Sequence, residues 1–159
     1  MAHTGTIITL TTDFGTRDWY VAAMKGVILG INPAARIVDL THEIQSHNVL
    51  EGALFLRGSA RYFPPGTIHV VVVDPGVGSE RRPLCVKAAQ HYYIAPDNSV
   101  LSLVVPPEEP LKAVAIENAR YLRPTVSATF HGRDVFAPAA AHVSLGVDMK
   151  ELGPEVHEI

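Results

Sequence analysis

The segment 68–81 constrains the fold of this chain more than any other. It begins with the apolar run Ile68–Val73, which contains four consecutive valines, and continues into Asp74-Pro75-Gly76. Such a run is typical of the covered central strand of a parallel sheet. Ligands of open α/β sheets bind where strands end at their carboxyl edge, so Asp74 is a candidate site residue. The alternative is that Asp74 only shapes a turn, because Asp-Pro-Gly is ordinary turn chemistry.

Strands and helices alternate along the rest of the chain. We expect further strands at Ile7–Thr12, Arg36–Leu40, Leu84–Ala89, Tyr92–Ala95 and Lys112–Ile116. We expect helices at Asp18–Leu29, from Asn48 to about Phe63, at Asn98–Val105, and at Phe130–Leu145 with a late start or kink at Pro138. This alternation predicts a three-layer α/β/α domain over residues 1–159 with a mostly parallel sheet.

Two helical details can be compared directly with a structure. Asn48 is a candidate N-cap with Glu51 in capping-box register. The buried side of that helix is expected to consist of Val49, Ala53, Leu54, Ala60 and Phe63.

At the other end of the chain, the segment 153–155 is expected to leave the domain.

Composition excludes several classes of partner. A formal charge of −3 on 159 residues gives no general attraction to nucleic acid or to anionic membranes. No apolar run reaches the ~20 residues that a membrane span needs. The single cysteine, Cys85, allows no intramolecular disulfide. Residues 1–5 do not resemble a signal peptide, so we expect a cytoplasmic protein without nucleic-acid or membrane partners.

Two carboxylates at strand ends are candidate ligand contacts. Asp13 follows the first strand, where an acidic side chain can accept hydrogen bonds from the two hydroxyls of a ribose, or can cap the following helix. Arg81 is expected to pair with Asp74, because a nearby guanidinium keeps a carboxylate ionised and oriented; the alternative is a solvated surface charge. Gly76-Val77-Gly78 is a poor dinucleotide fingerprint, since the third glycine is missing.

A third polar cluster lies before the last helix, at Thr129–Asp134. Its His131 is either structural, the commoner fate of a lone histidine, or catalytic. Pro96-Asp97-Asn98 is adequately explained as a turn. No histidine or cysteine spacing indicates a metal site, and no Gly-x-Ser-x-Gly motif indicates a serine nucleophile.

Five stretches together resemble the N-terminal domain of the S-adenosylmethionine hydroxide adenosyltransferases, which are related to the fluorinases and chlorinases. The matching stretches are Leu10–Asp18, Asp39–Glu43, Val73–Arg81, Ala95–Asn98 and Phe130–Pro138. The resemblance implies hydrolysis of S-adenosylmethionine to adenosine and methionine, with no cofactor and no metal. It also implies that Asp74, Arg81 and His131 position and deprotonate a water, with either Asp74 or His131 as the base. The substrate contacts that it implies are Asp13 for the ribose and Asp18, Phe130 and Asn98.

Two features of the family bear on how far this resemblance reaches. Halide-using relatives replace the Asp-Arg-His set with a neutral pocket, so halogenation is the less favoured activity. Family members add a C-terminal β-barrel and form trimers whose sites lie between subunits, whereas this chain stops at Ile159. We therefore expect an isolated domain or gene fragment, a half-site that needs a separate barrel partner, or a non-catalytic adenosine-binding module, and favour the first.

Overall fold

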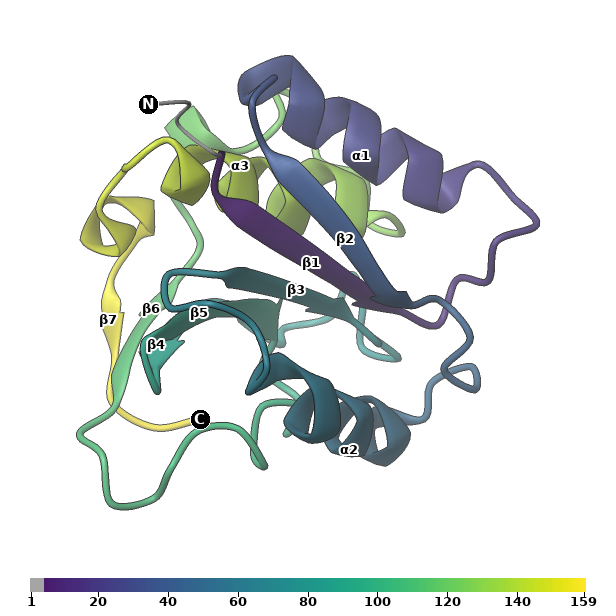
Figure 1. Ribbon diagram of the computed structural model, residues 1–159. Coiled ribbons are helices and arrows are strands. Elements are labelled where there is room, and N and C mark those ends of the chain that lie inside the picture. The colour runs from purple at the N-terminus through teal and green to yellow at the C-terminus, as the bar shows by residue number, and fades with distance from the viewer. Residues whose placement is uncertain (1–4) are drawn as a thin grey trace.

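A seven-stranded mixed sheet forms the centre of the protein, described here by a computed structural model of residues 5–159 (Figure 1). Its strands are β1 (Ile7–Thr12), β2 (Arg36–Thr41), β3 (Ile68–Val72), β4 (Pro83–Ala88), β5 (His91–Pro96), β6 (Lys112–Ala115) and β7 (Glu155–Val156). They lie in the order β2-β1-β3-β5-β4-β6-β7. The pairings among β2, β1, β3 and β5 are parallel, and the remaining pairings are antiparallel.

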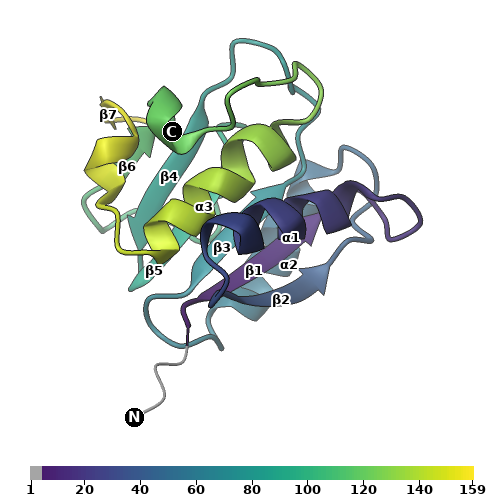
Figure 2. The same ribbon diagram turned by 90° about the horizontal axis from the view of Figure 1, so that it is seen from above.

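Helices cover both faces of this sheet. Helices α1 (Tyr20–Ile31) and α3 (Ala137–Ser144) pack together on one face, and α2 (Val49–Ala60) covers the other (Figures 1 and 2). A separate apolar cluster fills each interface, one around Phe136 and Met24 and the other around Leu56 and Val71. The α/β prediction with helices on both faces is therefore confirmed, although the antiparallel half of the sheet is larger than expected.

Short helical turns complete the chain. Two 3₁₀ turns lie at Ala119–Tyr121 and Met149–Leu152, and a π-helical turn at Gly132–Phe136 precedes α3. The last predicted helix is therefore helical from His131 onward, and its α-helical part, α3, starts late, with Pro138 in the first turn after the π-helical turn. None of the helices within residues 5–159 has the length and apolarity needed to cross a membrane. Residues 1–4, within the segment inspected for a signal peptide, lie outside the described residues.

Helix α2 begins as predicted and buries Ala53 and Ala60 as predicted, but it does not bury Leu54. The Asn48 side chain accepts a hydrogen bond from the Glu51 amide at 3.0 Å, whereas the Glu51 carboxylate accepts from the Gln45 amide instead of closing the capping box. Gly52 lies so close to the sheet that a Cβ there would be 3.2 Å from a Val73 methyl. The close face consists of small residues and Leu56, so the expectation that Leu54 is buried was wrong; it is 46% exposed.

Two further expectations were wrong. Residues 98–105 form successive turns instead of a helix, because Ser99 adopts φ +73° and Pro106 disfavours helical backbone at the preceding residue. The segment 153–155 does not leave the domain. The chain returns to the sheet there, where the Ala115 amide donates to the Pro154 carbonyl at 2.9 Å and β7 pairs with β6.

The parallel pairing of β1 with β3 sets the position of the candidate site. Thr12 is the register partner of Val72, the last residue of β3. Asp13 directly follows Thr12, and Asp74 follows Val72 with Val73 between them, so both carboxylates leave the sheet at the same carboxyl edge. The edge is the one at which open α/β sheets bind ligands.

A chain of buried hydrogen bonds joins the sheet to the end of α2. His91 Nε2 lies 3.1 Å from the Phe63 carbonyl, which can only accept, so this nitrogen carries the proton. His91 Nδ1 then accepts from His69 Nε2 at 3.1 Å, and His69 Nδ1 accepts from the Thr9 hydroxyl at 2.7 Å. Every ring nitrogen is used while both histidines are neutral. Burial, with His91 as a second cause, lowers the pKa of His69 to about 3.

This buried histidine predicts acid sensitivity. Between its ordinary pKa of 6.5 and about 3, the unfolded chain takes up a proton on His69 that the folded chain does not. We expect the free energy of unfolding to fall over this range as pH is lowered, by up to about 1.4 kcal/mol per pH unit from this group. Urea unfolding at a series of pH values gives the slope of the free energy of unfolding against pH. Relative to the unaltered chain, this slope should be shallower for His69→Asn and unchanged for the exposed-histidine control His157→Asn. An unchanged slope in His69→Asn would contradict the assignment.

The turn after Asp74 requires a glycine at residue 78. Gly78 has φ +77°, and a Cβ there would lie 2.4 Å from the Ala128 carbonyl oxygen. We expect Gly78→Ala to destabilise the fold by about 1–3 kcal/mol. The matched control is Gly26→Ala within α1, where a Cβ meets nothing within 4 Å and removal of glycine should stabilise by about 0.5–1 kcal/mol. Thermal unfolding of both variants measures the difference, and equal midpoints would contradict the close approach.

Candidate active site

Asp74 and Arg81 form a buried ion pair at the carboxyl edge of the sheet. Arg81 Nε donates to both Asp74 oxygens, at 2.9 and 3.1 Å, and Arg81 Nη2 donates to Oδ2. The two side chains are 4% and 8% exposed, so the attraction is screened little by solvent. The glycine-containing turn brings Arg81 back onto Asp74, as expected from the sequence.

His131 joins this pair through the same guanidinium. Arg81 Nη2 lies 2.8 Å from His131 Nδ1. Because an arginine can only donate, Nδ1 must accept, and the neutral ring then carries its proton on Nε2. Burial first and the Arg81 charge second lower the pKa of His131, outweighing the opposite effect of Asp74 and Asp134. The neutral tautomer is therefore favoured at neutral pH.

Asp13 and Phe130 complete a cavity of about 240 Å³ with Asp74 and His131. The Asp13 carboxylate accepts through Oδ2 from the His47 amide at 2.8 Å, which ties the loop after β1 to the loop after β2. Phe130 packs edge-on against Phe14 and Tyr20. The cavity thus combines acidic oxygens, an imidazole and an aromatic wall, while Arg81 lies behind Asp74 and His131.

A second polar network supports the Asp13 loop, and the sequence did not reveal it. The Thr12 hydroxyl and the Asp39 carboxylate contact the two ring nitrogens of His42, each at 2.8 Å, and Lys25 binds Asp39 at 2.7 Å. The His42 carbonyl accepts from the Gly15 amide at 2.7 Å. In the sequence, the available signal for this network was the polar residues at the ends of the first two strands. These residues come together because β1 and β2 are parallel neighbours.

Asp134 holds the segment that carries His131. It is completely buried, accepts from the Ser127 amide at 2.8 Å, and forms ion pairs with Arg133 and Arg123. Burial, the largest single effect, would raise the pKa of this carboxyl, but the hydrogen bonds from Arg133 and the Ser127 amide and the charges of Arg133 and Arg123 together lower it. Asp134 lies in the π-helical turn that directly follows His131. Sequence reasoning quoted Asp134 within a cluster but gave it no role.

Two of the predicted contacts lie outside this cavity. Asp18 is exposed in the loop before α1 and does not line the cavity. The Asn98 amide donates to the Val73 carbonyl at 2.8 Å, and its oxygen accepts from the Val100 amide at 3.2 Å. Asn98 therefore fixes the backbone immediately before Asp74. Within residues 5–159, no three His, Cys, Asp or Glu side chains are grouped in a way that could hold a metal ion.

Comparison with known proteins gives a consistent family. Residues 8–153 match the family described as the SAM hydroxide adenosyltransferase N-terminal domain. The (R)-S-adenosyl-L-methionine hydrolase of Methanocaldococcus jannaschii is 44% identical over 92% of this chain and 57% of its own length. A fluorinase of an Actinoplanes species is 28% identical over 96% of this chain and 59% of its own length. The chain thus spans little more than half the length of these curated relatives.

The fold comparison agrees with the sequence comparison. A crystal structure of an uncharacterized conserved protein from Thermotoga maritima superposes with a TM-score of 0.90 at 40% identity, covering 94% of this chain and 57% of that one. The family match over residues 8–153 includes the segments that carry Asp13, Asp74, Arg81 and His131. The chain therefore belongs to the SAM hydroxide adenosyltransferase family, of which it represents the N-terminal domain.

Proposed function

We propose that the chain carries the water-activating half of an S-adenosyl-L-methionine hydrolase, which forms adenosine and L-methionine. The observation that carries the proposal is the Arg81 guanidinium, which binds Asp74 and His131 simultaneously beside a cavity that Asp13 also lines. Relatives at 40–44% identity bear the name of this activity, whereas the fluorinases are 25–28% identical.

The proposed reaction is an in-line displacement at the ribose 5′ carbon. The water oxygen forms a bond to this carbon while the carbon–sulfur bond breaks, and the bonding pair leaves with sulfur. Since the sulfonium becomes a neutral thioether, methionine needs no general acid to leave. The protein has to position the water and accept its proton, and correct positioning alone contributes up to roughly 7–11 kcal/mol.

The tautomer of His131 divides these tasks between the side chains. Because Arg81 occupies Nδ1, the protonated Nε2 is free to donate a hydrogen bond to the water oxygen. Asp74 accepts only from Arg81 among the contacts of the described residues, and its remaining lone pairs are the acceptors for the water proton. We therefore assign proton acceptance to Asp74, orientation to His131 and alignment of both to Arg81.

The substrate contacts follow from the cavity wall. Asp13 keeps Oδ1 free to accept from a ribose hydroxyl, since Oδ2 is bound to the His47 amide. Phe130 offers an aromatic face to the nucleoside. Asp18 is assigned to the methionine ammonium and acts from outside the present cavity, whereas Asn98 acts by fixing the backbone before Asp74.

The size of the cavity favours a second candidate, a half-site. About 240 Å³ is less than the roughly 300–1,000 Å³ of small-molecule sites. A barrel domain, supplied by a longer form of the chain or by a separate partner in a trimer, would add the missing wall. Without it, the chain would bind adenosine or S-adenosylmethionine and release no product. A halide site is disfavoured, because the ionised Asp74 would repel the anion.

We place this protein, with its single buried cysteine, in the cytoplasm.

Hydrolysis in isotopically labelled water tests the proposed function. Incubation of the purified chain with a mixture of sulfonium epimers of S-adenosyl-L-methionine in ¹⁸O-water should place the label in the 5′ hydroxyl of adenosine, with the (R) epimer consumed first. Chromatography with mass spectrometry measures both results, and calorimetry measures substrate binding. Binding without adenosine release would establish the half-site, and labelled homoserine with 5′-methylthioadenosine as its co-product would contradict attack at the 5′ carbon.

The neutral His131 predicts the acid limb of the pH profile. Protonation would place an N–H on Nδ1 against the Arg81 donor, so hydrolysis should decline only below pH 6.5, the ordinary value from which the His131 pKa is lowered. His131→Ala should reduce kcat by about 10²–10⁴-fold with little change in thermal stability. His157→Ala is the control with an exposed histidine. Activity that persists per folded molecule in His131→Ala would return this residue to a structural role.

A further inference from the structure

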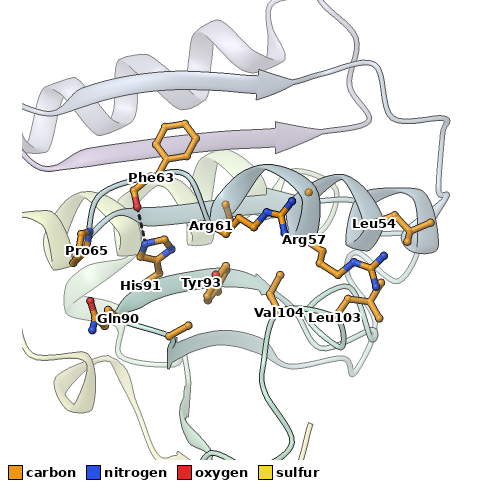
Figure 3. A pocket seen from close by; sticks show the side chains of 13 residues that line it. Leu54, Arg57, Arg61, Phe63, Pro65, Gln90, His91, Tyr93, Leu103 and Val104 are labelled. Carbon is orange, nitrogen blue, oxygen red and sulfur yellow. Dashed lines mark hydrogen bonds between the residues drawn. The ribbon is translucent and has the colours of Figure 1, made fainter.

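A second and larger cavity lies at the opposite edge of the sheet from Asp74. Its volume is about 730 Å³, within the size range of small-molecule sites. It lies between the last turns of α2, the turn joining β4 to β5, and the segment 103–104 (Figure 3). None of the residues assigned to hydrolysis lines it, so it is independent of the proposed function.

The cavity is positively charged. Arg57 in the last turn of α2 and Arg61, which caps the C-terminal end of this helix, both line it, as Figure 3 shows. Within residues 5–159 neither arginine forms an ion pair, although Arg61 donates to the Tyr62 hydroxyl at 3.1 Å. The C-terminal end of α2 contributes only about −0.5 charge, and Glu109, which accepts from the Ala89 amide at 3.3 Å, lies outside the lining. An excess of positive charge therefore faces the cavity.

Tyr93 supplies an unused hydrogen-bond donor. The residue is 3% exposed and lines the cavity, yet its hydroxyl has no hydrogen-bond partner among the described residues. Among the described residues, Thr11 Oγ1 is the side-chain nitrogen or oxygen that is both fully buried and without a hydrogen-bond partner. Since the Tyr93 hydroxyl has no partner either, it is not fully buried and keeps access to the cavity. Burial raises the pKa of Tyr93 to about 12, which leaves the phenol protonated and able to donate.

The histidine that lines the cavity, His91, is structural. His91 lines it, but both of its ring nitrogens are already bound, one to His69 and one to the Phe63 carbonyl, the contact dashed in Figure 3. These two hydrogen bonds hold the His91 ring in place and leave neither of its nitrogens free to bind a metal ion. The remaining walls are largely apolar and include Leu54, Leu103 and Val104.

We propose that this cavity binds a small organic anion. Its phosphate, sulfonate or carboxylate group lies between Arg57 and Arg61, where guanidinium groups recognise planar or tetrahedral oxyanions well. Its apolar or aromatic body lies against Leu103 and the ring of Tyr93, whose hydroxyl donates a further hydrogen bond. Charge alone would attract an inorganic anion, so the apolar wall is what distinguishes this class of ligand.

Phenyl phosphate and its two halves, inorganic phosphate and phenol, test this assignment. Titration of the intact chain, followed by amide NMR, should shift Gly58 and Gln90 while leaving His47 unmoved, and phenyl phosphate should bind more tightly than either half. The double variant Arg57→Gln with Arg61→Gln should weaken binding at least about tenfold, and Tyr93→Phe about threefold. Arg36→Gln, which removes an exposed arginine of β2, should leave the affinity unchanged.

Three results would overturn the proposal. The first is absence of phenyl phosphate binding by a folded chain. The second is an affinity that the double arginine variant does not change. The third is a shift confined to His47 and its neighbours, which would place the anion at the other edge of the sheet. Circular dichroism confirms that each variant remains folded before its affinity is compared.

Discussion

The parallel pairing of β1 with β3 is the constraint on which the candidate site depends. Its register places Thr12 beside Val72, so Asp13 and Asp74, which lie one and two residues beyond these positions, present carboxylates at one edge. Both strands are buried, and a slip of one residue would turn their side chains to the opposite faces of the sheet. The apolar packing on both faces therefore fixes the positions from which Asp13 and Asp74 leave the sheet, and the hydrogen bonds of these side chains orient them.

Electrostatics then convert this geometry into a defined protonation state. A single guanidinium satisfies an ionised carboxylate and a neutral imidazole, because it offers several donors in one plane. A lysine would present one compact charge and could not hold both partners in the same arrangement. The buried histidines on the far side of β3 show the same principle without a cation, since each neutral ring donates once and accepts once.

Much of the fold and part of the site could be predicted from sequence, for identifiable reasons. Valine runs, Asn48 and Pro138 act locally, and so the central strand, the start of α2 and the late start of α3 were predicted. Asp74 and Arg81 are close in sequence, and a short turn suffices to pair them. Leu54 and the segment 98–105 were mispredicted because helix rotation and a left-handed Ser99 depend on tertiary packing. The roles of His42 and Asp134 needed the three-dimensional structure.

The contact between Arg81 and His131 joins residues that are 50 positions apart in the sequence, and that between Asp13 and His47 spans 34. Such contacts exist only while the loops between them are closed, which the pairing of the sheet strands ensures. A partly folded chain would therefore hold helices and hairpins but no aligned Asp–Arg–His group. The site is assembled by the topology of the sheet as a whole, and a chain that keeps these residues but loses the pairing of its strands would lack the arrangement.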